Sequence, residues 1–187
     1  MDADELLTKV ARGEASSGDL EAAANQLRAR EGNSDPYTLL LALGRSGDRR
    51  IRDIVERYLV DPSDPMLTRL ALQVACRYWG EVDRYVSHVE RFLAGVTGDE
   101  ENDVRQMAVS IAGDYLQCNE NKRLLSLLLQ MVQDEALSEF QRSAAYIALA
   151  HAMGKSRQEL PRPTRMPPFE QLVDPALVAA ARLRLSS

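Results

Sequence analysis

The stretch Val55-Glu56-Arg57-Tyr58-Leu59 recurs 34 residues later as Val89-Glu90-Arg91-Phe92-Leu93. In both copies the apolar positions keep the i, i+3, i+4 spacing of one helical face. Three arginines, Arg69, Arg105 and Arg142, recur at intervals of 36 and 37 residues, each near the start of an expected helix. A period of 34 to 37 residues built from two helices is typical of an α-solenoid, because one helical hairpin cannot bury its apolar stripe without a stacked neighbour.

The composition of the whole chain agrees with a helical fold. Its 187 residues include 26 Leu and 23 Ala against 4 Ile, and aromatic residues make up 5%. Strong helix formers therefore dominate, and the usual strand formers are scarce. No apolar stretch is long enough to span a bilayer, and the acidic start lacks the pattern of a secretory signal. We predict an all-α protein of the cytoplasm that does not enter the membrane.

Local signals predict where several helices begin and end. Asp35-Pro36 and Asp64-Pro65 each place a capping side chain before a proline, which is tolerated in the first turn of a helix. Thr97 to Glu100 and Ser138 to Gln141 both have the spacing of a capping box. Four of the eight prolines lie between Leu160 and Pro168, so we expect an extended strap there. Terminal helices are expected over 4–12 and 19–31 and, interrupted near Asp174-Pro175, over 169–185.

The repeated positions resemble those of HEAT-repeat proteins, whose first helices carry Asp-Pro, then Val-Arg, then Ala. The matching residues are Asp64-Pro65 with Arg69, Asp103-Val104-Arg105 with Ala108, and Arg142 with Ala145. The resemblance implies a short right-handed α-solenoid of stacked antiparallel helix pairs with N- and C-terminal capping helices. The expected layout is one domain over 1–187, with N-terminal capping helices in 1–34, HEAT-like repeats in 35–154, and a Pro/Arg-rich strap and C-terminal helix in 155–187.

The resemblance also implies that the repeated arginines bond to a neighbouring repeat, often to its Asp. The alternative is that these arginines bind an anion. The tail from residue 155 onward carries a charge of +3 and the preceding residues -8, which predicts that the tail lies along the acidic body.

We find no catalytic constellation in the sequence. His88 and His151 are 63 residues apart and lack the spacing of metal ligands, and no phosphate-binding loop or nucleophile elbow is present. Cys76 and Cys118 are expected to be buried free thiols. The acidic run from Asp99 to Asp103 is interpreted as a helix N-terminus, and Trp79 as a side chain that covers a turn. We therefore predict no catalytic residue, no metal and no cofactor.

Two enzymatic alternatives come from the HEAT resemblance, an alkyl-base DNA glycosylase and a phycobilin lyase. A glycosylase of this kind needs a basic groove and several aromatic side chains that hold the damaged base. This chain has a single Trp and a body of charge -8, which disfavours nucleic acid. A lyase cannot be separated from a binding protein on these residues.

The favoured hypothesis is a non-catalytic protein-binding module. In stacked helix pairs the second helices line a concave face, and their polar positions are where a partner is recognised. Those positions are Arg52, Glu56, Arg84, His88, Arg91, Arg123 and Gln130. With Asp53, these positions carry both charges, which suits a protein partner because the carboxylates would repel a nucleic-acid backbone. The excess of Arg over Lys indicates GC-rich, bacterial coding, and one member of this class is an immunity or inhibitor protein that neutralises a bacterial toxin.

Overall fold

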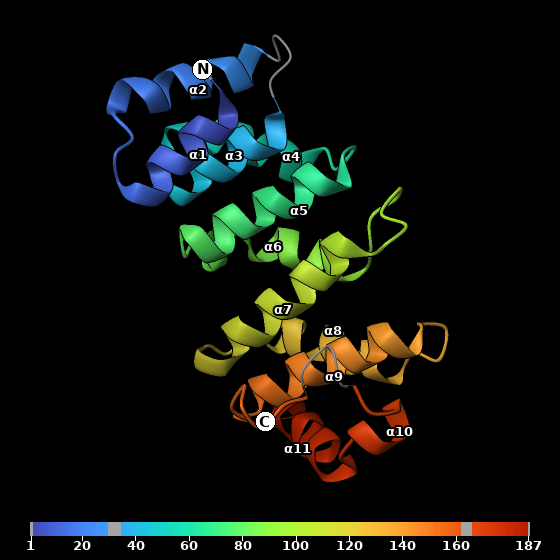
Figure 1. Ribbon diagram of the computed structural model, residues 1–187. Coiled ribbons are helices and arrows are strands. Elements are labelled where there is room, and N and C mark those ends of the chain that lie inside the picture. The colour runs from blue at the N-terminus through green and yellow to red at the C-terminus, as the bar shows by residue number, and fades with distance from the viewer. Residues whose placement is uncertain (1, 30–34, 162–165, 187) are drawn as a thin grey trace. The chain divides into compact units, whose positions relative to one another are not determined.

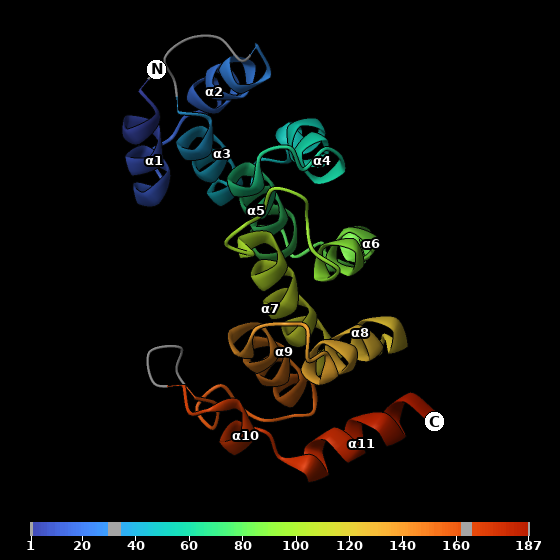
Figure 2. The same cartoon turned by 90° about the vertical axis from the view of Figure 1, so that its right-hand side faces the viewer.

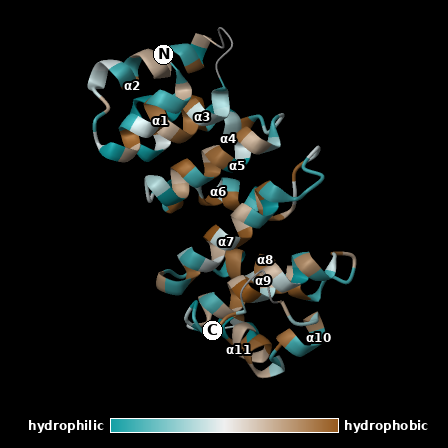
Figure 3. Cartoon of the chain, in the orientation of Figure 1, coloured by the Kyte–Doolittle hydropathy of each residue, from teal (hydrophilic) through white to brown (hydrophobic). Residues whose placement is uncertain are grey.

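The computed structural model describes residues 2–29, 35–161 and 166–186. Within these ranges the regular structure is helical and contains no strand, which confirms the all-α prediction (Figure 1). Most helices carry both hydrophobic and hydrophilic residues along their length (Figure 3). The α-helices of the described residues are α1 (Ala3–Arg12), α2 (Ser17–Ala29), α3 (Pro36–Arg45), α4 (Arg52–Val60), α5 (Pro65–Gln73), α6 (Val82–Leu93), α7 (Asp103–Cys118), α8 (Lys122–Gln133), α9 (Glu139–Ala152), α10 (Phe169–Leu172) and α11 (Pro175–Ser186).

The chain divides into two compact units, which are described separately. Unit 1 comprises Met1–Val86 and Gly95–Val104, and unit 2 comprises Ser87–Ala94 and Arg105–Ser187. Helix α6 therefore begins in unit 1 and ends in unit 2. Every helix within the described ranges is too short or too polar to cross a membrane.

In unit 1 the helices α1, α3 and α5 form a row. Helix α3 packs against α1, α2 and α5, and α5 packs against α4 (Figure 2). The core of this row includes Leu6, Leu39 and Leu70, which are fully buried. Gly44 allows α3 to lie close to Val74, because a Cβ at position 44 would overlap the side chain of Val74. Helices α1, α3 and α5 therefore pack in chain order.

Helix α5 ends in a π-helical turn, Val74–Tyr78, that the sequence pattern did not predict. The chain reverses at Gly80, whose φ of 69° lies in the left-handed region that favours glycine. Trp79 precedes this glycine and is 5% exposed. The side chain of the only tryptophan is therefore buried.

In unit 2, helix α8 packs against α9 and α11, and α10 packs against α9. The break between α10 and α11 lies at Asp174-Pro175, as predicted. Segment 155–161 has no α-helix. Residues 162–165 of the expected strap lie outside the described residues. Residues 30 and 31 of the expected second helix lie outside them as well. The tail contacts the unit through Arg157, which bonds to Asp114, and through Arg184, which donates to the carbonyl oxygen of Ala152. The first contact joins opposite charges, and the second ends on a backbone carbonyl.

The two predicted capping boxes have different outcomes. Ser138 and Gln141 form the box at the start of α9 as predicted. The box at Thr97 is wrong, because α7 begins only at Asp103. Asp99 caps that helix instead, with its two carboxylate oxygens accepting from the backbone N–H groups of Asp103 at 2.9 Å and Val104 at 3.0 Å. The acidic run is thus a helix N-terminus, but the loop geometry sets which residue caps it.

A hydrogen bond joins the start of each of three first helices to the end of the preceding second helix. Arg105 donates to the carbonyl oxygen of Ala94, and Arg142 donates to that of Val132 at 3.2 Å. At the start of α5 this bond comes from the hydroxyl of Thr68, beside the half-buried Arg69, to the carbonyl oxygen of Tyr58. Carbonyls at helix C-termini lack intrahelical donors, so these bonds satisfy them. These bonds to backbone carbonyls support the structural interpretation of Arg105 and Arg142.

The cysteines also differ from each other. Cys76 is buried as predicted, and burial raises the pKa of its thiol to about 12. Cys118 is exposed, so the prediction that both thiols are buried is wrong. It is the last residue of α7, where the apolar stripe has already ended.

Candidate functional site

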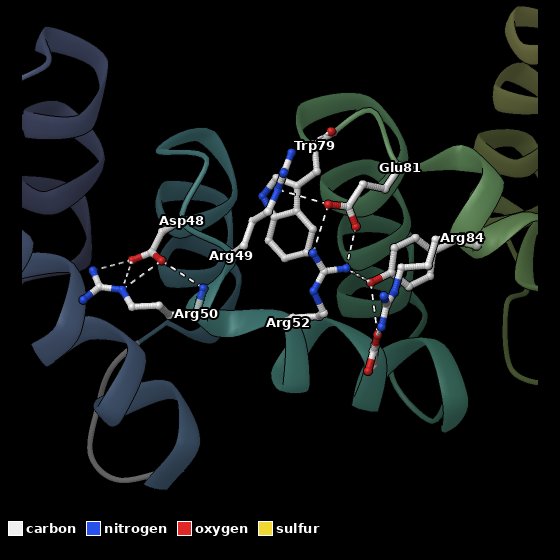
Figure 4. Close-up of polar contacts among 9 residues, drawn as sticks. Asp48, Arg49, Arg50, Arg52, Trp79, Glu81 and Arg84 are labelled. Atoms are coloured by element: carbon white, nitrogen blue, oxygen red, sulfur yellow. Dashed lines mark hydrogen bonds and ion pairs between the residues drawn. The ribbon is translucent and has the colours of Figure 1, made fainter.

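The candidate site is a set of ion pairs and hydrogen bonds between the starts of α4 and α6 in unit 1 (Figure 4). We call it the arginine–glutamate network. It consists of Arg49, Arg52, Glu56, Glu81, Arg84 and Tyr85, which lie on the second helices of two successive pairs or just before them. The three arginines and two glutamates leave one net positive charge.

The centre of the network is the pair between Arg52 and Glu81. Arg52 Nη1 and Nη2 donate to the two carboxylate oxygens of Glu81 at 2.5 and 2.9 Å. Their side chains are 27% and 19% exposed, so water screens this pair less than it screens a fully exposed one. The hydrogen bonds from Arg52 hold the pKa of Glu81 below its ordinary value. Glu81 is therefore ionised at neutral pH and fixes the orientation of the guanidinium.

Contacts with Trp79 and with Arg49 also hold Arg52 and Glu81 in position. The Cζ of Arg52 lies 5.6 Å from the centroid of the Trp79 ring, a cation–π arrangement. Arg49 donates from Nη2 to the carbonyl oxygen of Trp79 at 2.9 Å, and its Nε lies 3.1 Å from Glu81. The turn that follows α5 is thus clamped to the start of α4 by two arginines.

Tyr85 connects this pair to a second one. Its hydroxyl accepts a hydrogen bond from Arg52 at 3.3 Å and donates to Glu56 at 3.2 Å. The ring is buried, and burial is the main reason that the pKa of Tyr85 is raised. Glu56 also accepts from Arg84 Nη2 at 3.0 Å. Unlike the central pair, this one is exposed, with 56% of the Arg84 side chain accessible to water.

The same side of unit 1 carries two further pairs beside the network. Arg28 of α2 donates from Nε and Nη2 to the carboxylate of Asp53 on α4, each at 3.1 Å. Asp48 accepts from its neighbour Arg50, whose hydrogen bonds lower the pKa of Asp48 (Figure 4). Charged pairs therefore connect the second helices α2, α4 and α6 in succession.

The predicted recognition residues fall into three places. Arg52, Glu56 and Arg84 come together in the network. His88 and Arg91 lie on the part of α6 that belongs to unit 2, next to the buried Phe92, and the Cζ of Arg91 is 4.7 Å from the centroid of its ring. The remaining two are exposed on α8: Arg123 and Gln130.

The sequence reasoning missed three members of the network, Arg49, Glu81 and Tyr85. One signal was available, because opposite charges recur at similar offsets along the chain. The offsets are 25 residues for Arg28 and Asp53, 29 for Arg52 and Glu81, and 28 for Glu56 and Arg84.

The charged groups of the network are paired with one another. Its glutamates are both bonded to arginines, and no group of three or more His, Cys, Asp or Glu side chains within the described ranges could hold a metal ion. Comparison with protein-family models, curated proteins and solved structures finds no significant match for this chain.

Proposed function

We propose that this chain is a non-catalytic protein-binding module of the cytoplasm, built as a right-handed HEAT-like solenoid, that recognises its partner through the second helices of its pairs. The observation that carries the proposal is that exposed arginines on these helices are held in place by carboxylates. Arg84 is bonded through Nε and Nη2 to Glu56, which leaves its Nη1 outside that pair. A side chain that is already ordered loses less entropy when a partner binds.

The charge of this surface favours a protein over a nucleic acid. Glutamates and aspartates alternate with the arginines, so few contacts with phosphates could form without nearby repulsion. Arginine is also among the residues that contribute most to protein interfaces. We expect a partner with carboxylates that meet the outer edges of Arg49 and Arg84, both more than half exposed.

The test uses a variant that keeps the internal pair while it interchanges the surface charges. In Glu56→Arg/Arg84→Glu the two side chains can still bond to each other, so the fold should be retained. The immobilised chain is incubated with lysate of the cells that carry its gene, and bound proteins are identified and their affinities measured. We expect the affinity of the captured partner to fall at least about tenfold, since charge-assisted contacts at a partner surface are lost.

The matched control is Arg12→Glu, an exposed arginine on α1, a first helix. It changes charge outside the second helices and should leave the affinity unchanged. An affinity that the interchange leaves intact would refute the assignment of this surface. Tight binding of double-stranded DNA with a steep dependence on salt would refute the choice of a protein partner.

A further inference from the structure

A second candidate site lies in unit 2, apart from the residues of the arginine–glutamate network. It is a pocket of about 380 Å³ between α7 and α9, bordered by the segment that follows α9. This volume is in the range of pockets that hold small organic molecules. The apolar part of the lining includes Val109, Gly113, Ala144, Ile147, Leu160 and Met166. A molecule that fills this pocket therefore needs an apolar body.

Small side chains and one aromatic ring shape the apolar part. A Cβ at Gly113 would come within 2.9 Å of backbone atoms of Ala148, so α7 and α9 touch at this point. Ala144, one turn before Ala148 on α9, lines the pocket beside this contact. Phe140, one further turn back, also lines the pocket and is 51% exposed. An apolar body in the pocket would shield part of this ring from water, which is favourable.

The charged side chains of the lining form one cluster, Asp114, His151 and Arg157. Arg157 donates from Nη2 to Asp114 Oδ1, and His151 Nε2 lies 3.5 Å from the same oxygen. The charges of Arg157 and Asp114 cancel, and the His151 ring is either neutral or positive. The cluster is therefore neutral or positive in both states of His151, and its net charge does not repel an anion.

Arg157 is the member of this cluster with unused donors. Its side chain is 67% exposed, and its hydrogen bond to another described residue uses Nη2 alone. Nε and Nη1 lie outside that bond, and the planar guanidinium presents its N–H groups in the arrangement that matches a carboxylate. Asp114, in contrast, already contacts Arg157 and His151 and has further interactions. The donors that await a partner at this end therefore belong to the arginine.

We propose that the pocket between α7 and α9 binds a small carboxylic acid with an apolar body. The carboxylate accepts hydrogen bonds from Arg157, which Asp114 holds at the pocket. The body packs on Val109, Ala144 and the ring of Phe140.

The test is a two-dimensional NMR titration of the isotope-labelled full chain at neutral pH. The probes are phenylacetate, phenylacetamide and 2-phenylethylamine, which carry an anionic, a neutral and a cationic head on one ring. We expect phenylacetate to bind at least about fivefold more tightly than phenylacetamide, because its charged head forms charge-assisted bonds to an arginine that is partly open to water. The amine should also bind less tightly than phenylacetate.

Three variants separate the head from the body. Arg157→Gln should lower the affinity for phenylacetate at least about fivefold and leave that for phenylacetamide within about twofold. The matched control Arg123→Gln removes an exposed arginine of α8 in the same unit, outside the lining, and should change neither affinity. Ala144→Leu fills the apolar part and should abolish binding of both probes, while an unchanged circular dichroism spectrum shows that the fold is retained.

An amide or amine that binds as tightly as phenylacetate would overturn the proposed carboxylate. An affinity for phenylacetate that Arg157→Gln leaves unchanged would overturn the role of this arginine. Probe binding that Ala144→Leu leaves intact, or no binding of any probe, would overturn the pocket itself.

Discussion

The arginine–glutamate network contains two ion pairs of different burial, and their contributions to stability should differ accordingly. Arg52 and Glu81 are joined by two hydrogen bonds and are each less than one third exposed. Hydrogen bonds to charged groups contribute about 1.5–3 kcal/mol when they are sheltered from water. Arg84 and Glu56 are 56% and 38% exposed, and exposed pairs contribute about 0.2–1 kcal/mol. We therefore expect a coupling energy of about 2 kcal/mol between Arg52 and Glu81. The coupling energy between Arg84 and Glu56 should be less than half of that value.

Double-mutant cycles measure both values. One cycle combines Arg52→Met with Glu81→Gln, and the other combines Arg84→Met with Glu56→Gln, with free energies of unfolding taken from urea titrations. Glu81 also contacts Arg49. Replacing Glu81 removes this contact whether residue 52 is Arg or Met, so the contact cancels in the coupling energy. Unchanged m-values show that the unfolded state is comparable between variants. Equal coupling energies, or a larger one for the exposed pair, would refute the argument from burial.

Two further predictions concern acid stability and the bonds at helix ends. The pKa of Glu81 is lowered from its ordinary 4.5, mainly by its bonds to Arg52. The stabilisation from the ionised Glu81 is therefore present above pH 4.5 and is lost as the pH falls through the lower pKa of the folded state. In urea titrations Glu81→Gln should cost less stability at pH 3 than at pH 7, and an equal cost would contradict this. Arg105→Ala should lower the free energy of unfolding by about 1–3 kcal/mol, because the carbonyl of Ala94 loses its donor. The control Arg12→Ala should stay within about 0.5 kcal/mol in the same assay.

The helical class and several helix limits could be predicted because they depend on neighbouring residues. Proline at the starts of α3 and α5 and the reciprocal bonds of Ser138 and Gln141 are local features, and the structure contains them. The start of α7 was mispredicted because the cap comes from Asp99, four residues before the helix. Asn102 adopts a positive φ of 59° in the intervening loop, which no spacing rule anticipates.

The candidate site was only partly predictable for a related reason. The pattern identified Arg52, Glu56 and Arg84 as polar positions on second helices, and all three belong to the network. The bonds between these side chains depend on the rotation of each helix about its own axis. The π-helical turn before Trp79 changes this rotation, and the spacing of apolar residues does not predict such a turn. His151 and Asp114 of unit 2, whose Nε2 and Oδ1 atoms lie 3.5 Å apart, were not paired by the sequence pattern because they are 37 positions apart and share no motif.

The bonds between helix ends have a consequence for the order in which the chain folds. Thr68 is 10 residues from Tyr58, Arg105 is 11 from Ala94, and Arg142 is 10 from Val132. Loops of about ten residues close within roughly 10–100 ns, far faster than distant contacts form. During synthesis each new helix can therefore attach to the one before it while the rest of the chain is still on the ribosome. The charged pairs between second helices, which span 25 to 29 residues, then close on helices that are already joined.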